Sequence, residues 1–221
     1  MKHVPAFDII VAISLGLCLA CSSSVRQKSD FYPSKQIKQQ WTEVKGKEGS
    51  FVNDGLFTSW YDNGRKELEG SFTQGVKTGL WVSWYENGRV KDSTFYSNGV
   101  PDGRSVSYFD NGARQSEGVF HLGLKDGIWT SYFKSAATEE QGAYVDGFLS
   151  GKWVLWYENG QKHQESNFVQ GLLDGNQITW RKSGLRWTEG QYRKGLKTGK
   201  WTTWDENGLI SKEESLSDTG E

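Results

Sequence analysis

The sequence contains little cysteine, proline or methionine, and it has no excess of charge of either sign. Its 221 residues include 2 Cys, 3 Pro and 1 Met, and both cysteines lie at or before position 21. The rest of the chain therefore cannot form a disulfide or a thiolate metal site. The formal net charge is −1 at pH 7, which provides no overall positive field for nucleic acid. We therefore expect no nucleic-acid partner.

Long aliphatic runs are also rare, whereas glycine and aromatic residues are abundant. Hydrophobic residues make up only 35% of the chain, but it carries 27 Gly and 11 Trp. The buried apolar area must then come mainly from rings, which bury about 150–250 Å² each. High glycine and aromatic content with little proline is typical of many short strands joined by tight turns.

The one long apolar run lies near the N-terminus, where Lys2 precedes residues 9–20. It is shorter than the roughly 20 residues that span a bilayer, and its length is typical of an export signal. The run ends in Cys-Leu-Ala-Cys, and three serines follow Cys21. This stretch resembles a bacterial lipoprotein signal, which implies removal of residues 1–20 and acylation of Cys21. A plain cleaved signal and an uncleaved anchor are the alternatives.

A lipoprotein signal implies an exported protein of the bacterial cell envelope that is held at a membrane by its lipid. Ser22, rather than Asp, follows the cysteine, and by analogy with other lipoproteins this favours the outer membrane. Residues 21–50 are polar, so we expect a tether there, with a degenerate first half-repeat as the alternative. Residues 214–221 are expected to form an acidic C-terminal tail.

Residues 51–213 contain seven copies of a 24-residue unit. Each copy begins with a glycine at position 55, 79, 103, 127, 151, 175 or 199. An aromatic residue follows five positions later, and in most copies an Asn-Gly pair follows soon after it. The predicted turn residues are Asn63, Gly64, Asn87, Gly88, Asn111, Gly112, Asn159, Gly160, Asn207 and Gly208.

The unit predicts a β-hairpin. Asn-Gly is typical of a type I′ turn, so we expect that turn between the two strands. The segment Gly75–Gly79 is expected to join one repeat to the next, with Val76 folding back to fill the layer beneath. Because side chains alternate along a strand, Val82 and Trp84 share one face and Trp81 lies on the other. We expect the Val82 and Trp84 face to form the continuous core.

The predicted fold is all-β. It is an elongated array of stacked antiparallel hairpins, forming a twisted single sheet or an open solenoid about 65 Å long. The pattern G-x-W-x-x-W-Y-x-N-G, followed by another aromatic residue and glycine, recurs over residues 55–213. It resembles the bacterial MORN-repeat variant family, some members of which are labelled antitoxin-like. The resemblance implies a scaffold without shared catalytic residues, and it makes an antitoxin-like immunity protein one alternative function.

The pattern fails at a few positions, and we look for function there. Residues 134–137 replace the Asn-Gly turn of the fourth repeat, so a longer or differently shaped turn is expected. Ser105 and Gln177 stand where the other copies have their first aromatic residue.

No catalytic constellation is evident. His121 and His163 occupy non-equivalent repeat positions, and no nucleophile elbow, zinc motif or phosphate loop is present. We therefore predict a protein that is not an enzyme and that uses no cofactor and no metal. The acids that precede Asn-Gly, such as Glu86, are expected to be solvated turn residues.

The first aromatic position of the unit supplies the candidate binding residues. They are Trp81, Trp129, Trp153 and Trp201. Such a row could be exposed and bind a protein or a sugar face, or it could pack against the return strand, which is the favoured interpretation. The leading functional hypothesis is a non-enzymatic envelope lipoprotein acting as a repeat scaffold for a protein partner. The alternative is a carbohydrate- or peptidoglycan-binding protein that uses these aromatics.

Overall fold

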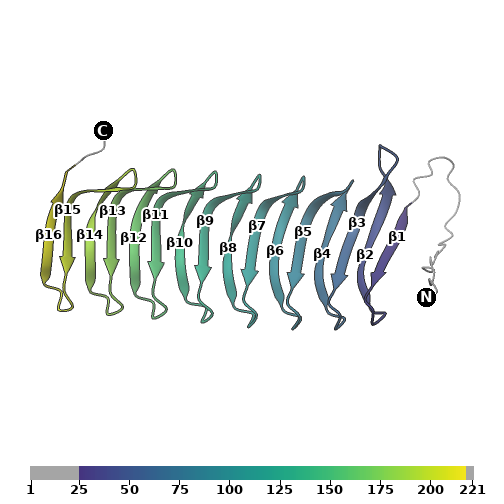
Figure 1. Ribbon diagram of the computed structural model, residues 1–221, viewed down its shortest axis with the longest axis horizontal. Coiled ribbons are helices and arrows are strands. Elements are labelled where there is room, and N and C mark those ends of the chain that lie inside the picture. The colour runs from purple at the N-terminus through teal and green to yellow at the C-terminus, as the bar shows by residue number, and fades with distance from the viewer. Residues whose placement is uncertain (1–24, 218–221) are drawn as a thin grey trace, which may run out of the picture.

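The computed structural model describes residues 25–217 as one open layer of sixteen antiparallel strands (Figure 1). Every strand is hydrogen-bonded to its neighbours in sequence, so the chain runs as an uninterrupted meander. β1 and β16 are the two free edges and lie at opposite ends of the array. The predicted all-β array of stacked hairpins is confirmed.

Each 24-residue repeat supplies two strands, from β3 and β4 in the first repeat to β15 and β16 in the seventh. The sixteen strands are β1 (Arg26–Phe31), β2 (Ile37–Lys45), β3 (Phe51–Trp60), β4 (Lys66–Thr73), β5 (Val76–Trp84), β6 (Val90–Ser97), β7 (Val100–Tyr108), β8 (Arg114–His121), β9 (Leu124–Tyr132), β10 (Thr138–Val145), β11 (Phe148–Trp156), β12 (Lys162–Val169), β13 (Leu172–Trp180), β14 (Arg186–Arg193), β15 (Leu196–Trp204) and β16 (Ile210–Leu216). At the usual spacing between strands, the array is about 72 Å long.

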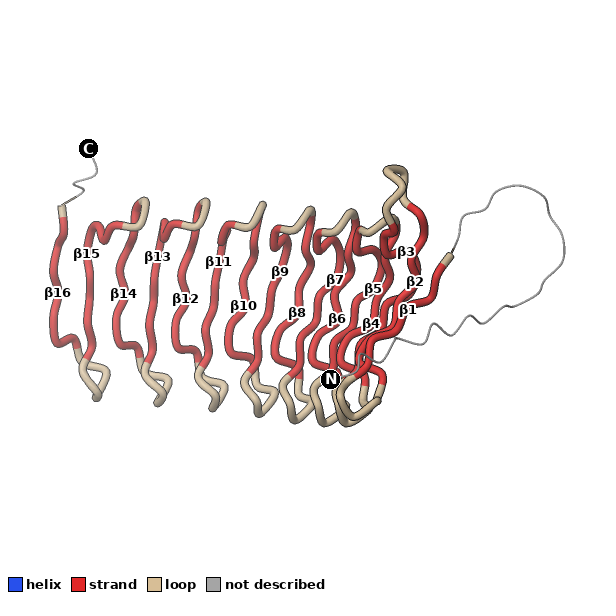
Figure 2. Tube along the Cα trace, turned by 45° about the vertical axis from the view of Figure 1, so that its right-hand side comes forward, coloured by secondary structure: helices blue, strands red, loops and turns tan. Residues whose placement is uncertain are grey.

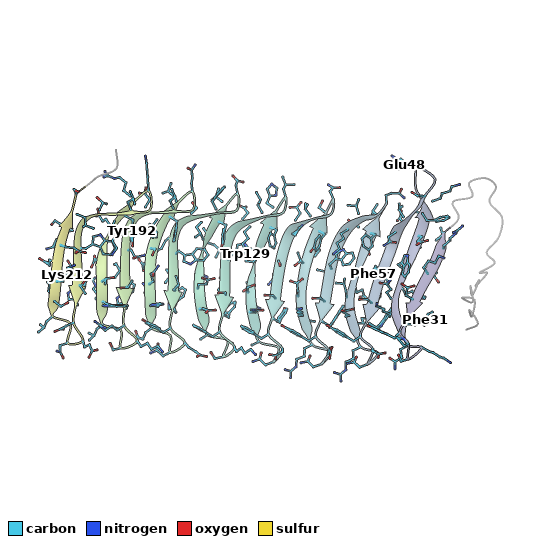
Figure 3. All side chains as sticks on the ribbon, in the orientation of Figure 1. Phe31, Glu48, Phe57, Trp129, Tyr192 and Lys212 are labelled. Atoms are coloured by element: carbon cyan, nitrogen blue, oxygen red, sulfur yellow. The ribbon has the colours of Figure 1, made fainter. Side chains whose placement is uncertain are left out.

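The segment before the seven repeats is also a hairpin. The tether predicted for residues 21–50 is wrong over β1 and β2, which continue the sheet. The alternative expectation, a degenerate half-repeat, is closer, but the segment forms a whole hairpin. The Tyr32 hydroxyl donates to the main-chain oxygen of Trp60 at 2.8 Å, as the Tyr61 hydroxyl does to Trp84 one repeat later. Lys35, with a φ of 70°, takes the place of the turn glycine. Glu48 lies in the longer loop that joins this hairpin to β3 (Figure 3).

Two further predictions concern the ends of the chain. The expected tail over 214–221 begins inside a strand, because β16 continues to Leu216. The predicted signal peptide and the proposed acylation site Cys21 lie outside the described residues.

Type I′ turns occur at the edge of the sheet opposite to the predicted one. They join each repeat to the next, and both central residues have positive φ, 48–49° for the first and 81–87° for the glycine. The pairs are Gln74-Gly75, Asn98-Gly99, Leu122-Gly123, Asp146-Gly147, Gln170-Gly171 and Lys194-Gly195. Each glycine N–H then donates to a main-chain oxygen near the start of a strand in the preceding repeat, as from Gly99 to the Lys77 oxygen in β5 at 3.0 Å.

The Asn-Gly turns are longer than predicted. In the 85–89 turn only Gly88 has positive φ, at 85°, and the register shifts between Ser83 and Trp84. The Tyr85 N–H bonds to the Arg89 oxygen at 2.8 Å, closing a three-residue loop. Asn87 Oδ1 accepts the Arg89 N–H at 2.9 Å, which is a local side-chain turn that does not require positive φ at asparagine. The type I′ prediction is therefore wrong here.

Each repeat-starting strand bends near its beginning, at the upper edge of the sheet in Figure 2. In β5, Glu69 pairs with Val82, whereas Ser71 pairs with Thr78, so β5 carries two extra residues in this interval. One of them is Gly79, with a φ of 68°. The bend is a β-bulge, and it turns the start of the strand over the face that carries Trp81. We call this face the inner face.

Candidate functional site

The candidate binding tryptophans are buried in the bend. Their exposed fractions are 3% for Trp81, 7% for Trp129 and Trp153, and 5% for Trp201. They form a row with the aromatic residues of the return strands, as between Phe72 and Trp81, whose ring centroids lie 5.0 Å apart. Figure 3 shows Phe57, Trp129 and Tyr192 along this row. The exposed row that a binding role required is absent, and the packing interpretation holds.

A glycine on the adjacent strand makes room for each of these rings. A Cβ on Gly70, Gly118 or Gly190 would lie 2.2 Å from the nearest ring atom, and one on Gly142 only 1.7 Å from Trp153. No side chain larger than hydrogen fits between these strands while the tryptophan is present. We call Trp81, Trp129, Trp153 and Trp201 the corner tryptophans.

Where the tryptophan is absent, the glycine is absent too. Ser105 faces Thr94, and their hydroxyl oxygens lie 2.8 Å apart. Gln177 faces Ser166, and its amide donates to the serine hydroxyl at 3.1 Å. At these two places a hydrogen-bonded polar pair stands where the other repeats have a buried Trp-Gly pair. The hydrogen bond satisfies the polar groups that are buried there. Sequence reasoning found Ser105 and Gln177 but missed the matching changes at Thr94 and Ser166, which the 24-residue alignment contains.

The opposite face, which we call the outer face, is not the dominant core that was predicted. Val106 and Val154 are buried there, but Trp84 and the aromatic residues equivalent to it are only half-buried. The corner tryptophans are shielded better because the bent strand covers them. In β5, for example, Lys77 lies over Trp81 with its Nζ 4.2 Å from the ring centroid.

Carboxylates paired with cations line the outer face. Glu117 is bonded by Arg104 at 3.2 Å, by Arg114 at 2.6 Å and by the Tyr132 hydroxyl at 2.8 Å. Burial alone would raise the pKa of Glu117, but these hydrogen bonds and the Arg114 charge outweigh it and lower the pKa. The charge of Glu117 is therefore neutralised by cations of its own repeat.

Glu165 is held in the same way two repeats further on. Lys152 Nζ lies 2.5 Å and Lys162 Nζ 2.8 Å from its two carboxylate oxygens. Burial opposes ionisation, but the hydrogen bonds and charges of the two lysines outweigh it and lower the pKa of Glu165.

The predicted turn residues lie along one edge of the sheet and link successive repeats. The Asn87 amide donates to the main-chain oxygen of Asp110 at 2.8 Å, while its Oδ1 accepts the Arg89 N–H. Asn63, Asn111 and Asn159 make the same inter-repeat bond, at 3.1, 3.1 and 2.9 Å. Asparagine therefore closes its own turn and ties it to the next one, a role that the turn prediction did not include.

The apolar residue after each inter-repeat glycine does not fill the layer beneath, contrary to prediction. These residues are 39–61% exposed. They are Val76, Val100, Leu124, Phe148, Leu172 and Leu196, and we call them the edge stripe. The first five lie against the turn of the following repeat; for example, a Cβ on Gly99 would lie 3.2 Å from Val76 Cγ1. The type I′ turn directs their other side to solvent.

A hollow of about 500 Å³ opens on the inner face between β7 and β10. It is bounded by Ser107, Phe109, Ser116, Ser131, Phe133 and Glu139, among others. Two of the bounding groups, the hydroxyls of Ser107 and Ser116, lie 2.7 Å apart and bond to each other. The hollow lies beside the irregular turn at 134–137, where the sequence pattern fails.

The turn at 134–137 has the same length as the others but differs in its chemistry. Ala136 occupies the glycine position with a φ of 68°, which is strained for a residue with a Cβ. Lys134 Nζ pairs with Asp110 Oδ1 at 3.0 Å, and through a hydrogen bond and its charge it lowers the pKa of Asp110. The expectation of a differently shaped turn is wrong, since Phe133 and Ala137 are bonded as in the other repeats.

Residues 25–217 contain no group of three or more His, Cys, Asp or Glu side chains placed to hold a metal ion. His121 Nδ1 lies 3.5 Å from Asp102, and the His163 ring packs against Tyr157 at 4.4 Å between centroids. The two histidines thus belong to different local environments. Over the same residues, no helix is long and apolar enough to cross a membrane.

Comparison with known proteins identifies MORN-type repeats in two places. Residues 77–98 and 149–170 match the model of the MORN repeat variant family. The first segment covers the β5–β6 hairpin and the second the β11–β12 hairpin, three repeats later. No curated protein matches the chain. The matches support a repeat scaffold built from these hairpins.

Proposed function

We propose that this protein is a non-enzymatic lipoprotein of the bacterial cell envelope, whose repeat array presents the edge stripe to a protein partner. The observation that carries the proposal is the stripe itself. The same repeat position holds an exposed aliphatic or aromatic side chain six times in succession. A monomer that exposes a regular apolar row over several repeats is typical of a docking surface.

The stripe suits a long partner. Its members recur at the distance of two strands, about 9.5 Å, so contact with several of them requires an extended surface. The larger side chains, Leu124, Phe148, Leu172 and Leu196, lie toward the C-terminal half of the array. We expect that half to supply most of the apolar contact.

The anchor places the other end of the array near the membrane. If Cys21 is acylated, only about 17 Å of extended chain can separate it from Arg26 at the start of β1. The first hairpin would therefore lie close to the lipid headgroups. The C-terminal part of the edge stripe would lie up to about 70 Å along the array from the anchored hairpin.

The edge stripe can be tested by site-specific photo-crosslinking in intact cells. A photoreactive residue at Phe148 or Leu172 is expected to capture a discrete protein. The control is Glu158, an exposed residue at the opposite edge of the same part of the sheet. Equal capture from Glu158, or no capture from either stripe position, would contradict the proposed docking surface.

The anchor has a separate test. Cys21→Ser is expected to abolish labelling by a fatty-acid analogue and to release the protein from the membrane fraction. Label that persists in this variant would place the lipid elsewhere. The two tests are independent, because loss of the anchor leaves the edge stripe intact.

A further inference from the structure

We propose that the hollow between β7 and β10 binds one pyranose ring of an uncharged glycan. This site lies on the inner face, away from the edge stripe, so the inference does not depend on the protein partner. It rests on the composition of the hollow and on two local departures from the repeat that produce it.

The first departure is a run of small polar side chains across the hollow. Ser107, Ser116 and Ser131 lie on three consecutive strands, and cross-strand pairing joins Ser107 to Ser116 and Ser116 to Ser131. The position of Ser107 and Ser131 carries serine in the first four repeats, and Leu155 occupies it in the fifth. A leucine side chain there fills the space that serine leaves open. Ser116 is the departure, because the equivalent residues are all larger: Leu68, Asp92, Glu140, Gln164, Thr188 and Lys212. The hollow therefore lies where a serine on the return strand is flanked by serines on both sides.

The second departure concerns the aromatic residues at the rim. Tyr61, Tyr85 and Tyr157 each donate a hydroxyl hydrogen bond of 2.7–2.8 Å to the main chain of the next repeat. Phe109 and Phe133 occupy the equivalent positions in repeats three and four and have no hydroxyl. Both rings border the hollow. Neither ring can make the hydroxyl bond to the next repeat, and Lys134 Nζ lies 5.8 Å from the centroid of the Phe109 ring. The two rings supply the apolar part of the hollow.

The charge at the rim disfavours an anionic ligand. Lys134 is already paired with Asp110, and Glu139 adds a negative charge beside it. A phosphate or carboxylate would meet no free cation among the bordering side chains, so nucleotides and acidic peptides fit poorly. A purely apolar ligand would bury the serine hydroxyls without new partners, which is unfavourable.

A pyranose ring matches both parts of the hollow. Its hydroxyl groups can exchange hydrogen bonds with the serines and with the Gln115 amide, and its C–H face can pack on a phenyl ring. No covalent step is involved.

Binding can be measured by calorimetry with the full chain from which only the predicted signal segment, residues 1–20, has been removed. The probes are soluble oligomers of N-acetylglucosamine and of glucose, with a nucleoside triphosphate and an acidic peptide as charged comparators. Saturable binding of an uncharged oligosaccharide is expected. Binding of a charged comparator alone, or of none of the probes, would overturn the proposal.

Two variants locate the site. Ser131→Leu introduces the residue that the next repeat carries, and it is expected to weaken binding by about tenfold or more because it fills the hollow. Ser83→Leu, the same change one repeat before the hollow, is the matched control and is expected to bind normally. If Ser131→Leu perturbs the far-UV circular dichroism, Phe133→Ala replaces it, with the same loss expected. Unchanged affinity in the folded variant would refute the site.

Discussion

The Trp-Gly pairs in the bend lead to a double-mutant prediction, with Gly142 and Trp153 as the example. Gly142 lies between Trp129 on β9 and Trp153 on β11. Its equivalent two repeats earlier, Thr94, lies between Trp81 and Ser105. Replacing both Gly142→Thr and Trp153→Ser therefore recreates an arrangement that the protein already contains.

The single substitutions are expected to be costly. Trp153 is 7% exposed. At about 25 cal/mol per Å² over the roughly 150–250 Å² that such a ring buries, Trp153→Ser should lower the free energy of unfolding by about 4–6 kcal/mol. Gly142→Thr places a Cβ within 1.7 Å of the Trp153 ring and should cost about 1–3 kcal/mol or more through overpacking.

The double mutant should be more stable than the sum of these costs predicts. Threonine at 142 and serine at 153 can form the hydroxyl pair seen between Thr94 and Ser105, and the steric conflict disappears with the ring. We expect a coupling free energy of about 1–3 kcal/mol in favour of the double mutant.

The cycle can be measured by urea denaturation with far-UV circular dichroism, together with hydrogen exchange of the β10 and β11 amides, since repeat arrays can unfold locally. Gly151→Ala is the steric control, because nothing lies within 4 Å of its Cβ position and only its φ of 67° opposes the change. Costs that add to within about 0.5 kcal/mol would refute steric coupling between Gly142 and Trp153.

Three other predictions concern the turns and the outer face. Phe133→Tyr should raise the free energy of unfolding by about 0.5–1.5 kcal/mol. The new tyrosine hydroxyl can reach the main-chain oxygen of Trp156, as the Tyr157 hydroxyl reaches that of Trp180. An unchanged urea midpoint would argue against this bond. Gly160→Val should cost about 1–3 kcal/mol, since the φ of 82° strains a β-branched residue although space is available, and Gly160→Ala should cost less. The pKa of Glu165 is lowered in the folded protein, so its ion pairs stabilise the fold above the ordinary pKa of 4.5, and this stabilisation is lost as the pH falls from there through the folded pKa. Glu165→Gln should therefore make stability less dependent on pH on the acid side. An unchanged profile would count against the lysine pairs.

The proposed function and the inferred glycan site use different parts of the array. The edge stripe runs from β5 to β15, whereas the hollow lies where Ser116 replaces larger residues and Phe109 and Phe133 replace tyrosines of other repeats. A repeat scaffold can carry both, because each repeat contacts mainly its neighbours and can vary locally.

The sequence by itself determined the class of fold and the repeat register. Each 24-residue period contains two strands and two glycine-containing turns. A stacked array of hairpins satisfies both the alternation of side chains along the strands and the position of the turns. The Asn-Gly positions, the irregular segment at 134–137 and the exceptional residues Ser105 and Gln177 could all be read from the alignment of the repeats.

Only the tertiary structure decided which residues are buried and which are exposed. The bend at Gly79 and its equivalents turns each strand over the corner tryptophans, and it leaves the edge stripe outside. Alternation correctly separated Trp81 from Val82 and Trp84, but it could not show that the bulge would cover the Trp81 face, so the core was assigned to the wrong side. The first hairpin was anticipated only as a degenerate half-repeat, the alternative to a tether. Lys35 replaces its turn glycine, and the pairing of this polar hairpin with the sheet depends on contacts with β3 that its own sequence does not show.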